Sequence, residues 1–530
     1  MGLLSKLKLR LTIPRAYVVL FTLFVSLFSW SVSSPVGSSD DDNYHLASIW
    51  CANGSRDGLC ENGSNPSSRL VPYGVSTAGL CFLGDQLVTG ACALDTTTNP
   101  NSMVETTRLA APSESGLYYR FANLFISQNI EVSVILIRLI NSLILVFLLF
   151  LAFRASDNHM FPSLAWVFIL STIPYGLFFI ASTNSSSWLI IGVGAYSYFL
   201  MLCASPHKLK INYYAIVGTV CSALVAWSSR GEANPFLVIA TIAVVIHRFS
   251  GFRTISKRTL LIFSTGVTMI SFTLFFKSNT ASFAVSSFTY GDDDTPIVRP
   301  AQGVFMANIQ NLPSYFLGWM GGNPGIGQTD TELPSIVFVC VLAAISFLLI
   351  SSLNKNSWQM KASVAFVGAM LVFIPIWTLQ RSLLFVGEEL IPRYLLPLWV
   401  VFIGLVVVEN VGRQTRSQLI SVAILLSIAN SIALRQNLLR NTIGIDAYSV
   451  INLDKANEWW WQASLIPSPM TVWIVGSLAM LIASVLSAQM IGGTGGIRTP
   501  GPFEPSAFKA DAFVHSATVP FGNASGQSAT

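Results

Sequence analysis

Residues 16–45 read AYVVLFTLFVSLFSWSVSSPVGSSDDDNYH, and this stretch decides the fold class of the chain. Its first part, from Ala16 to Pro35, is an apolar run long enough to cross a bilayer as a helix, because a hydrocarbon layer of roughly 30 Å takes about 20 residues. Three carboxylates, Asp40 to Asp42, and the imidazole of His45 follow directly. Only 10% of the residues are charged, so this cluster is either a solvated collar or the functional centre of a membrane protein.

Apolar segments of this kind recur along the whole chain. Of the 530 residues, 52% are hydrophobic and 12% are aromatic, which exceeds what the core of a soluble globular protein requires. Windows of about 20 residues predict about twelve membrane helices. They lie near 16–36, 131–153, 163–182, 186–204, 211–228, 233–248, 259–277, 334–352, 362–379, 392–410, 417–434 and 471–490. The predicted fold is therefore an all-α, polytopic transmembrane helix bundle.

The distribution of Lys and Arg predicts the orientation of these helices. Cations gather in alternate connecting segments, such as Lys6 to Arg15 and Arg248 to Arg258, as expected for cytoplasmic segments. The short opposite loops keep only Arg230, Arg381 and Arg393, and the longer last one holds Arg435, Arg440 and Lys455. This asymmetry predicts that both termini are cytoplasmic. The net charge of +5 then reflects topology, and no nucleic-acid partner is expected.

Four segments follow from this topology. Residues 1–37 hold a cytoplasmic segment and the first membrane helix, although a cleaved signal peptide is the alternative for this basic and apolar start. Residues 38–130 form an extracytoplasmic region, and residues 131–490 form the multi-helix transmembrane domain. Residues 491–530 are rich in small and polar residues, which predicts a disordered cytoplasmic tail.

Four cysteines lie in the first extracytoplasmic region, where an oxidising compartment permits disulfides. Three connectivities are possible, and the short loops that they close favour Cys51 with Cys60 and Cys81 with Cys92. A zinc site is the competing interpretation, but the spacing lacks a tight CxxC pair.

Several residues near the outer ends of the helices are candidates for binding. Arg138 lies inside the second apolar segment, where a cation must face the protein interior or reach outward to the interface. Tyr118 and Tyr119 precede that segment, and an interfacial aromatic belt explains such a pair equally well. Arg393 and Tyr394 open a late helix, where an arginine fork suits phosphate oxygens or serves as an ordinary interfacial anchor.

In order along the chain, these motifs resemble those of a known family. An amino-terminal anchor precedes Asp41-Asp42-Asn43-Tyr44-His45, the Tyr118-Tyr119 pair and Arg393-Tyr394-Leu395-Leu396-Pro397. This order resembles the bacterial membrane-protein family catalogued as domain of unknown function 2142, which groups with the GT-C glycosyltransferases. The chain departs from the family pattern in three places. The usual Asp-Glu is Asp41-Asp42, the usual Pro-Pro before the tyrosines is reduced to Pro112 further upstream, and the usual Gly-Arg-Tyr is Pro392-Arg393-Tyr394.

The resemblance implies an enzyme of the bacterial plasma membrane that takes a sugar from a polyprenyl-phosphate donor. The acceptor would be a glycan or protein of the cell envelope, at the outer face. Asp41 or Asp42 would act as general base with His45 as its partner, and Arg393 would bind the donor phosphate together with Arg138. Tyr394, Tyr118 and Tyr119 would complete the substrate side. Some relatives bind a divalent ion through such carboxylates, so Mg²⁺ or Mn²⁺ at Asp41 and Asp42 stays open.

Two other classes of function remain open from the sequence. A transporter or flippase of lipid-linked sugars should place ionisable residues or broken helices near the membrane midplane. Here the conspicuous charges lie near the predicted outer surface, with Arg138 as the ambiguous case. A non-catalytic envelope assembly protein would tolerate the loss of its carboxylates, which distinguishes it from an enzyme.

Overall fold

The computed structural model describes most of the chain. The described residues are 14–97, 102–110, 116–156, 161–204, 212–248, 255–277, 300–322, 325–327, 330–353, 357–388, 390–410, 414–444, 451–456, 458–461 and 465–491. The predicted disordered tail, apart from Ile491, and the acidic run 292–294 lie outside them.

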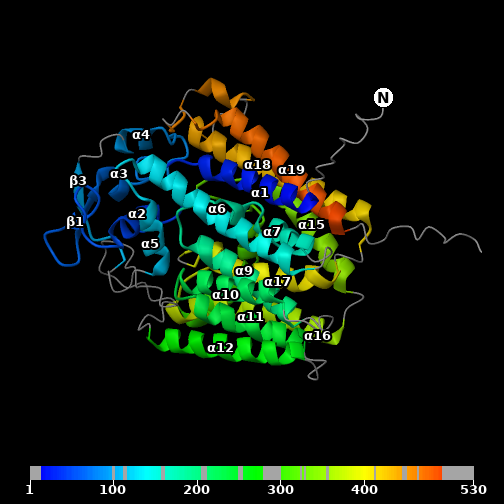
Figure 1. Cartoon of the computed structure of the whole chain (residues 1–530). Helices are drawn as coiled ribbons and strands as arrows, with labels where there is room; N and C mark the ends of the chain where they lie inside the picture. The colour runs from blue at the N-terminus through cyan, green and yellow to red at the C-terminus, as the bar shows by residue number, and fades with distance from the viewer. Residues whose placement is uncertain are drawn as a thin grey trace, which may run out of the picture. The chain divides into compact units, whose positions relative to one another are not determined.

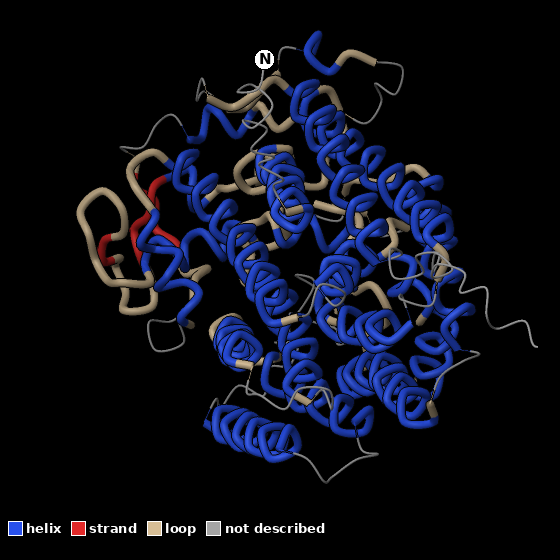
Figure 2. Tube along the Cα trace, turned by 45° about the vertical axis from the view of Figure 1, so that its right-hand side comes forward, coloured by secondary structure: helices blue, strands red, loops and turns tan. Residues whose placement is uncertain are grey.

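Long helices make up most of the described structure (Figures 1 and 2). Six are long and apolar enough to cross a membrane: α1 (Arg15–Val32), α6 (Ile130–Ala155), α9 (Ser186–Cys203), α16 (Trp358–Ser382), α18 (Arg416–Thr442) and α19 (Pro469–Ile491). The other large helices are α7 (Phe161–Thr172), α10 (Tyr213–Trp227), α11 (Ala233–Arg248), α12 (Ile255–Lys277), α15 (Ser335–Leu353) and α17 (Leu396–Asn410).

Each of the twelve predicted windows contains a helix, but a count of twelve membrane spans does not follow. Only the six helices above meet the length and composition of a span within the described residues. The third window is broken, because α7 ends at Thr172 and a separate short helix, α8 (Tyr175–Ile180), begins after Pro174. Proline removes a backbone donor and clashes with the preceding turn, which explains the break.

Side-chain caps fix where several helices begin. The side chain of Asn129 accepts a hydrogen bond from the backbone N–H of Val132 at the start of α6. Ser357 caps α16 in the same way, and Thr415 forms a reciprocal capping box with Gln418 at the start of α18. Such oxygens satisfy N–H groups that have no partner within the helix.

Helix α9 occupies the centre of the bundle. Every residue from Ser186 to Leu202 is buried, and α8, α10, α11 and α17 pack around it. Helix α1 packs between α6 and α19, although the latter lies at the far end of the described chain, and α18 packs against α19 (Figure 1). The end of α1 therefore meets both early and late segments of the sequence.

A small folded region lies at one end of these helices, and we call residues 42–125 the cap (Figures 1 and 2). It contains α2 (Asp42–Cys51), β1 (Glu61–Asn62), β2 (Arg69–Pro72), α3 (Tyr73–Ser76), α4 (Cys92–Thr97), β3 (Met103–Thr106), α5 (Leu117–Ala122) and η1 (Asn123–Phe125). The strands form an antiparallel sheet in the order β1-β2-β3. The structure is mostly helical, as expected, but the prediction of an all-α chain did not include this sheet. Its strands are too short to show an alternation of apolar and polar residues in the sequence.

Two disulfides close loops in the cap. Cys51 is bonded to Cys60, and Cys81 is bonded to Cys92. These are the two pairings that the sequence predicted. The first disulfide holds the end of α2 against the segment that leads into β1, so it fixes the sheet relative to α2.

Later segments complete the surroundings of the cap. Two short helices, α13 (Ala301–Asn311) and α14 (Pro313–Trp319), precede α15, and a single 3-10 turn, η2 (Pro392–Tyr394), precedes α17. Another 3-10 turn, η4 (Leu453–Ala456), follows α18. The indole of Trp319 donates to the carbonyl of Pro392 at 2.7 Å, so α14 holds η2 in place.

Candidate functional site

The turn between α1 and α2 positions the three consecutive carboxylates. Gly37 has φ +88° and touches Gly79 of the cap so closely that a side chain on either residue would collide with the other backbone. Asp41 also has positive φ, at 59°, which is uncommon for a residue other than glycine. The turn is therefore held close to the cap at Gly37, and Asp41 precedes the first residue of α2 with a non-helical backbone.

Asp41 bridges two arginines from distant parts of the chain. Its Oδ2 accepts a hydrogen bond from Arg393 at 2.6 Å, and its Oδ1 accepts one from Arg108 at 2.9 Å. The Arg393 side chain is 1% exposed, whereas those of Asp41 and Arg108 are 41% and 55% exposed. The structure thus brings Asp41 beside Arg393, although 352 residues separate them.

Asp40 and two aromatic rings surround the guanidinium of Arg393. Its Nη1 lies 3.3 Å from Oδ2 of Asp40, and the guanidinium lies over the rings of Phe179 and Tyr394. Burial raises the pKa of Asp40 to about 7, against the opposing effect of Arg393. Burial also acts to raise the pKa of Asp41, but Arg393 outweighs it and holds that pKa below its usual value. At neutral pH Asp41 is thus the ionised partner.

Asp42 is directed into the protein. Its Oδ1 accepts a hydrogen bond from the hydroxyl of Thr183 at 2.6 Å, and its Oδ2 accepts one from the N–H of Ser39 at 3.1 Å. Its side chain is fully buried, and this burial raises its pKa. Asp42 therefore links α2 to the segment before α9, and Asp41 is the carboxylate that solvent reaches.

His45 lies one turn into α2 and faces Tyr119. Its Nδ1 shares a hydrogen bond with the Tyr119 hydroxyl at 2.9 Å, and the two rings are stacked. Burial, together with the positive charges of Arg230 and Arg393, holds the pKa of His45 well below its usual range. The imidazole is therefore neutral at physiological pH, and it supports the site without carrying charge.

Tyr394 joins a further arginine to this group. The hydroxyl of Tyr394 accepts a hydrogen bond from Arg393 at 3.2 Å, and the guanidinium of Arg230 lies over the Tyr394 ring, 5.0 Å from its centre. Arg230 also pairs with Glu232 at 3.6 Å. The sequence singled out Tyr394 but gave no role to Arg230.

Arg138 and Tyr118 bind the protein's own backbone. Arg138 donates to the carbonyls of Ser31, Ser34 and Pro35 at 2.7 to 2.9 Å, so it caps the end of α1. The hydroxyl of Tyr118 donates to the carbonyl of Thr183 at 2.6 Å. Both side chains are buried. Neither meets Asp41 or Arg393 in the contacts described above, so both position the turn and the segment around it.

Arg108 is the residue of this site that the sequence did not indicate. Arg108 follows β3. Two residues further on, the backbone N–H of Ala110 donates a hydrogen bond to the hydroxyl of Ser48 on α2 at 2.9 Å. This bond ties the end of the sheet to the helix that begins at Asp42. A lone arginine 67 residues from Asp41 has no motif around it, so only the tertiary structure of the cap brings the two together.

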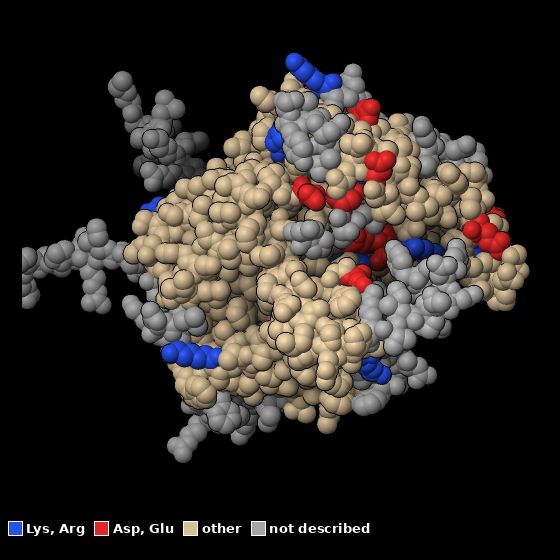
Figure 3. Space-filling view, turned by 180° about the vertical axis from the view of Figure 1, so that it is seen from behind, with Lys and Arg blue, Asp and Glu red and all other residues tan. Residues whose placement is uncertain are grey.

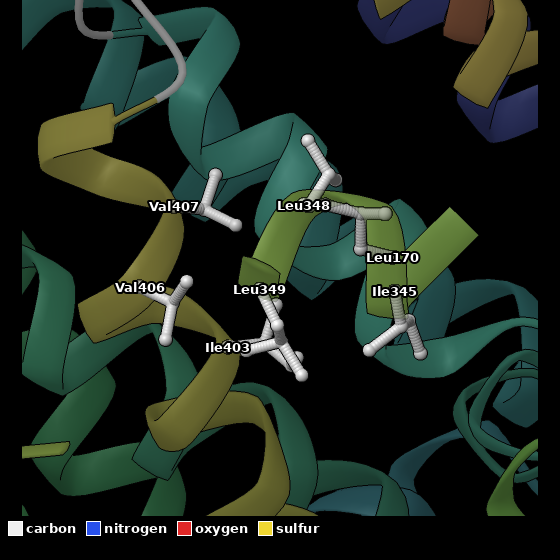
Figure 4. A pocket seen from close by; sticks show the side chains of 7 residues that line it. All are labelled: Leu170, Ile345, Leu348, Leu349, Ile403, Val406 and Val407. Carbon is white, nitrogen blue, oxygen red and sulfur yellow. The ribbon is translucent and has the colours of Figure 1, made fainter. Parts of the chain in front are cut away.

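Two cavities lie away from these residues. One, of about 10 Å³, is lined by aliphatic side chains (Figure 4): Leu170, Ile345, Leu348, Leu349, Ile403, Val406 and Val407. A larger one, of about 250 Å³, is lined by Leu317, Gly321, Gly322, Gly325, Glu332, Leu333, Ser335 and Phe338. The candidate site reaches the surface through Asp41 and Arg108, which are 41% and 55% exposed. Figure 3 shows acidic side chains gathered on one part of the face that it draws.

A divalent ion does not fit the two carboxylates that the sequence suggested. Both oxygens of Asp42 accept hydrogen bonds from the protein, and both oxygens of Asp41 face guanidinium groups. Among the described residues, no group of three or more His, Cys, Asp or Glu side chains is arranged to hold a metal.

A family model described as Predicted membrane protein (DUF2142) matches residues 24–402, from within α1 to within α17. The chain belongs to this family. The match confirms the family resemblance that the motifs indicated. No curated protein and no solved structure matches the chain. The family match includes Asp41, Arg108 and Arg393, whereas α18 and α19 follow its end.

Proposed function

We propose that this membrane protein transfers a sugar from a polyprenyl-phosphate donor to an acceptor of the cell envelope, at the outer face of a bacterial plasma membrane. The acceptor is a glycan or a protein, and both termini are cytoplasmic. The observation that carries the proposal is the contact between Asp41 and Arg393. There a solvent-accessible carboxylate, in the turn that follows the candidate span α1, lies beside a buried guanidinium.

The carboxylate is suited to act as a general base. As the acceptor oxygen attacks the anomeric carbon, the hydroxyl proton passes to Asp41 and the bond between that carbon and the donor phosphate breaks. A lowered pKa makes Asp41 a modest base, but it also keeps the carboxylate ionised. The acceptor hydroxyl becomes acidic only as the new bond forms, so a base of this strength is adequate.

The guanidinium of Arg393 is suited to the leaving group. The departing polyprenyl phosphate gains negative charge, and a guanidinium fork binds phosphate oxygens with two parallel hydrogen bonds. The stacking of Phe179 and Tyr394 fixes the orientation of Arg393 before substrate arrives. A lipid-linked donor would reach this position by lateral diffusion in the membrane.

The proposal is tested by Asp41→Asn in a strain whose own copy of the gene is deleted. We expect the envelope glycans to lose the sugar that the wild-type protein adds, because a general base contributes roughly 10²- to 10⁴-fold to the rate. The measurement is the monosaccharide composition of the purified envelope. Asp57→Asn is the matched control, since Asp57 is an exposed carboxylate of the same cap.

Two checks make the result interpretable. Thiol labelling shows whether Cys51 and Cys60 are still bonded, which reports a folded cap. Asp42→Asn is expected to reduce the amount of folded protein, because the amide keeps one acceptor oxygen and sets its NH2 group against the second of the two buried donors. A well-folded Asp41→Asn protein that restores the wild-type glycan composition sinks the catalytic proposal.

A further inference from the structure

We propose that Arg108 and Arg393 form a two-arginine phosphate site, that the Asp41 carboxylate occupies it in the resting protein, and that the phosphate of a membrane lipid displaces Asp41. The identity of that lipid as a polyprenyl phosphate rests on the proposed function. The site itself is inferred from the contacts of Asp41 and from the difference in exposure between its two arginines.

Asp41 makes the contacts that a bound phosphate would make. Its two oxygens each accept a hydrogen bond from a different guanidinium, at 2.6 Å from Arg393 and 2.9 Å from Arg108. Phosphate oxygens bind guanidinium groups in the same way. The hydroxyl of Tyr394, 3.2 Å from Arg393, lies beside them and offers a further polar contact.

The unequal burial of the three side chains makes an exchange possible. Arg393 is 1% exposed, so removing its anionic partners without a substitute would strand a buried charge. Asp41 and Arg108 are 41% and 55% exposed, so both can turn toward solvent at little cost. An incoming phosphate therefore replaces Asp41 while the charge balance at Arg393 is kept.

The two arginines are held in different ways. Arg393 is fixed on several sides by Asp40, Phe179 and Tyr394. The side chain of Arg108 contacts Asp41 and is 55% exposed, while β3 and the bond between Ala110 and Ser48 set where that side chain begins. Arg393 thus provides a buried, fixed contact, and Arg108 provides an exposed contact that can follow the anion.

Displacement would also prepare Asp41 for its proposed role. Arg393 and Arg108 both act to lower the pKa of Asp41 in the resting protein. When a phosphate binds to Arg393 and Arg108, the Asp41 carboxylate no longer contacts these two cations and becomes a stronger base. Binding of the donor and activation of the base are then coupled, which limits proton transfer to occasions when a donor is present.

The test measures equilibrium binding to the purified full-length protein in lipid nanodiscs. The probes are radiolabelled polyprenyl monophosphate, the matching polyprenol without phosphate, and inorganic phosphate. We expect Arg108→Gln to weaken binding of polyprenyl monophosphate about tenfold, because it removes one charge-assisted hydrogen bond. We expect Asp41→Asn to tighten that binding by a similar factor, because it removes the competing anion.

Arg120→Gln is the matched control, because Arg120 is an exposed arginine of α5 in the same cap, and it should leave binding unchanged. The inference is overturned if Asp41→Asn weakens binding or leaves it unchanged, or if Arg108→Gln has no effect. Equal affinities for polyprenol and its phosphate overturn the phosphate site. Equal affinities for inorganic and polyprenyl phosphate overturn the assignment to a lipid.

These outcomes are separate from those of the transfer proposal. If the wild-type protein binds polyprenyl monophosphate and Asp41→Asn tightens that binding, the phosphate site stands even when no sugar is transferred. If sugar transfer depends on Asp41 while Arg108→Gln leaves polyprenyl monophosphate binding unchanged, the transferase proposal is supported and the two-arginine site is contradicted.

Discussion

Two arginine–aspartate pairs of this protein have similar distances and equally buried arginines, but they differ in the exposure of the aspartate and in the other contacts of the arginine. Arg393 pairs with Asp41 at 2.6 Å, and Arg440 of α18 pairs with Asp330 at 2.8 Å. Both arginines are 1% exposed. The aspartates differ, because Asp41 is 41% exposed and Asp330 is 11% exposed.

The remaining donors of each arginine show what the difference means. Arg440 donates to the carbonyls of Phe82, Asp85 and Val88, so it binds the loop that the Cys81–Cys92 disulfide closes. Arg393 donates to one backbone carbonyl, that of Asp40, and otherwise faces the side chains of Asp40, Asp41 and Tyr394. A buried arginine held by several backbone carbonyls is architectural, whereas one held mainly by side chains, one of them an exposed carboxylate, can exchange its partner.

The largest effect is expected from breaking the architectural pair. Arg440→Gln should lower the free energy of unfolding by about 3 to 5 kcal/mol, because it leaves Asp330 and several carbonyls buried without their cation. The measurement is thermal unfolding of the purified protein in detergent. Arg416→Gln, an exposed position at the start of the same helix, is the control and should change little. A melting temperature for Arg440→Gln equal to that of the control would remove the distinction between the two pairs.

Much of this architecture was predictable from local sequence, because long apolar runs have few alternatives to a helix. All twelve windows contain one, and Pro174 marks the break between α7 and α8. The sheet was missed because its strands are two to four residues long and include polar and charged positions such as Glu61 and Arg69. Strands this short carry no period that a sequence can show.

The site was predictable only in part. The motif around Asp41 and the Arg393–Tyr394 pair could be recognised by resemblance, and the structure brings Asp41 and Arg393 together. What the sequence did not distinguish is exposure, since Asp41 and Asp42 are adjacent but face opposite environments. The sequence left open whether Arg138 faces the interior or the interface; it is buried, and its partners are carbonyls at the end of α1, which no residue pattern encodes.

An intermediate effect, which depends on pH, tests the surroundings of Arg393. The pKa of Asp40 is about 7 in the folded protein, whereas the ordinary value for an exposed aspartate, as in the unfolded chain, is 3.8. The folded state therefore holds this proton more tightly, and the ionisation of Asp40 reduces stability as pH rises from about 4 through 7. Asp40→Asn removes this titration. Between pH 5 and 8, the stability of Asp40→Asn relative to wild type should rise by on the order of 2 kcal/mol.

Thermal unfolding at several pH values measures this difference. Asp41 does not interfere, because its lowered pKa stabilises the folded state above about pH 4 and this contribution is lost only as the pH falls further. Asp57→Asn, in the exposed part of the cap, is the control for a general change in net charge. A pH-independent difference between Asp40→Asn and wild type would show that Asp40 is ionised throughout, and Arg393 would then face two permanent anions.

The smallest effect on stability is expected from Arg108→Gln. A small change in the free energy of unfolding would distinguish an exchangeable contact from a structural one. An exposed ion pair contributes about 0 to 1 kcal/mol, so Arg108→Gln should shift the free energy of unfolding by no more than that. The same substitution is expected to weaken phosphate binding about tenfold. Thermal unfolding and polyprenyl monophosphate binding are therefore measured on the same preparation. A loss of stability as large as that of Arg440→Gln would make Arg108 an architectural residue, because a side chain that holds the fold together cannot leave Asp41 to bind an incoming anion.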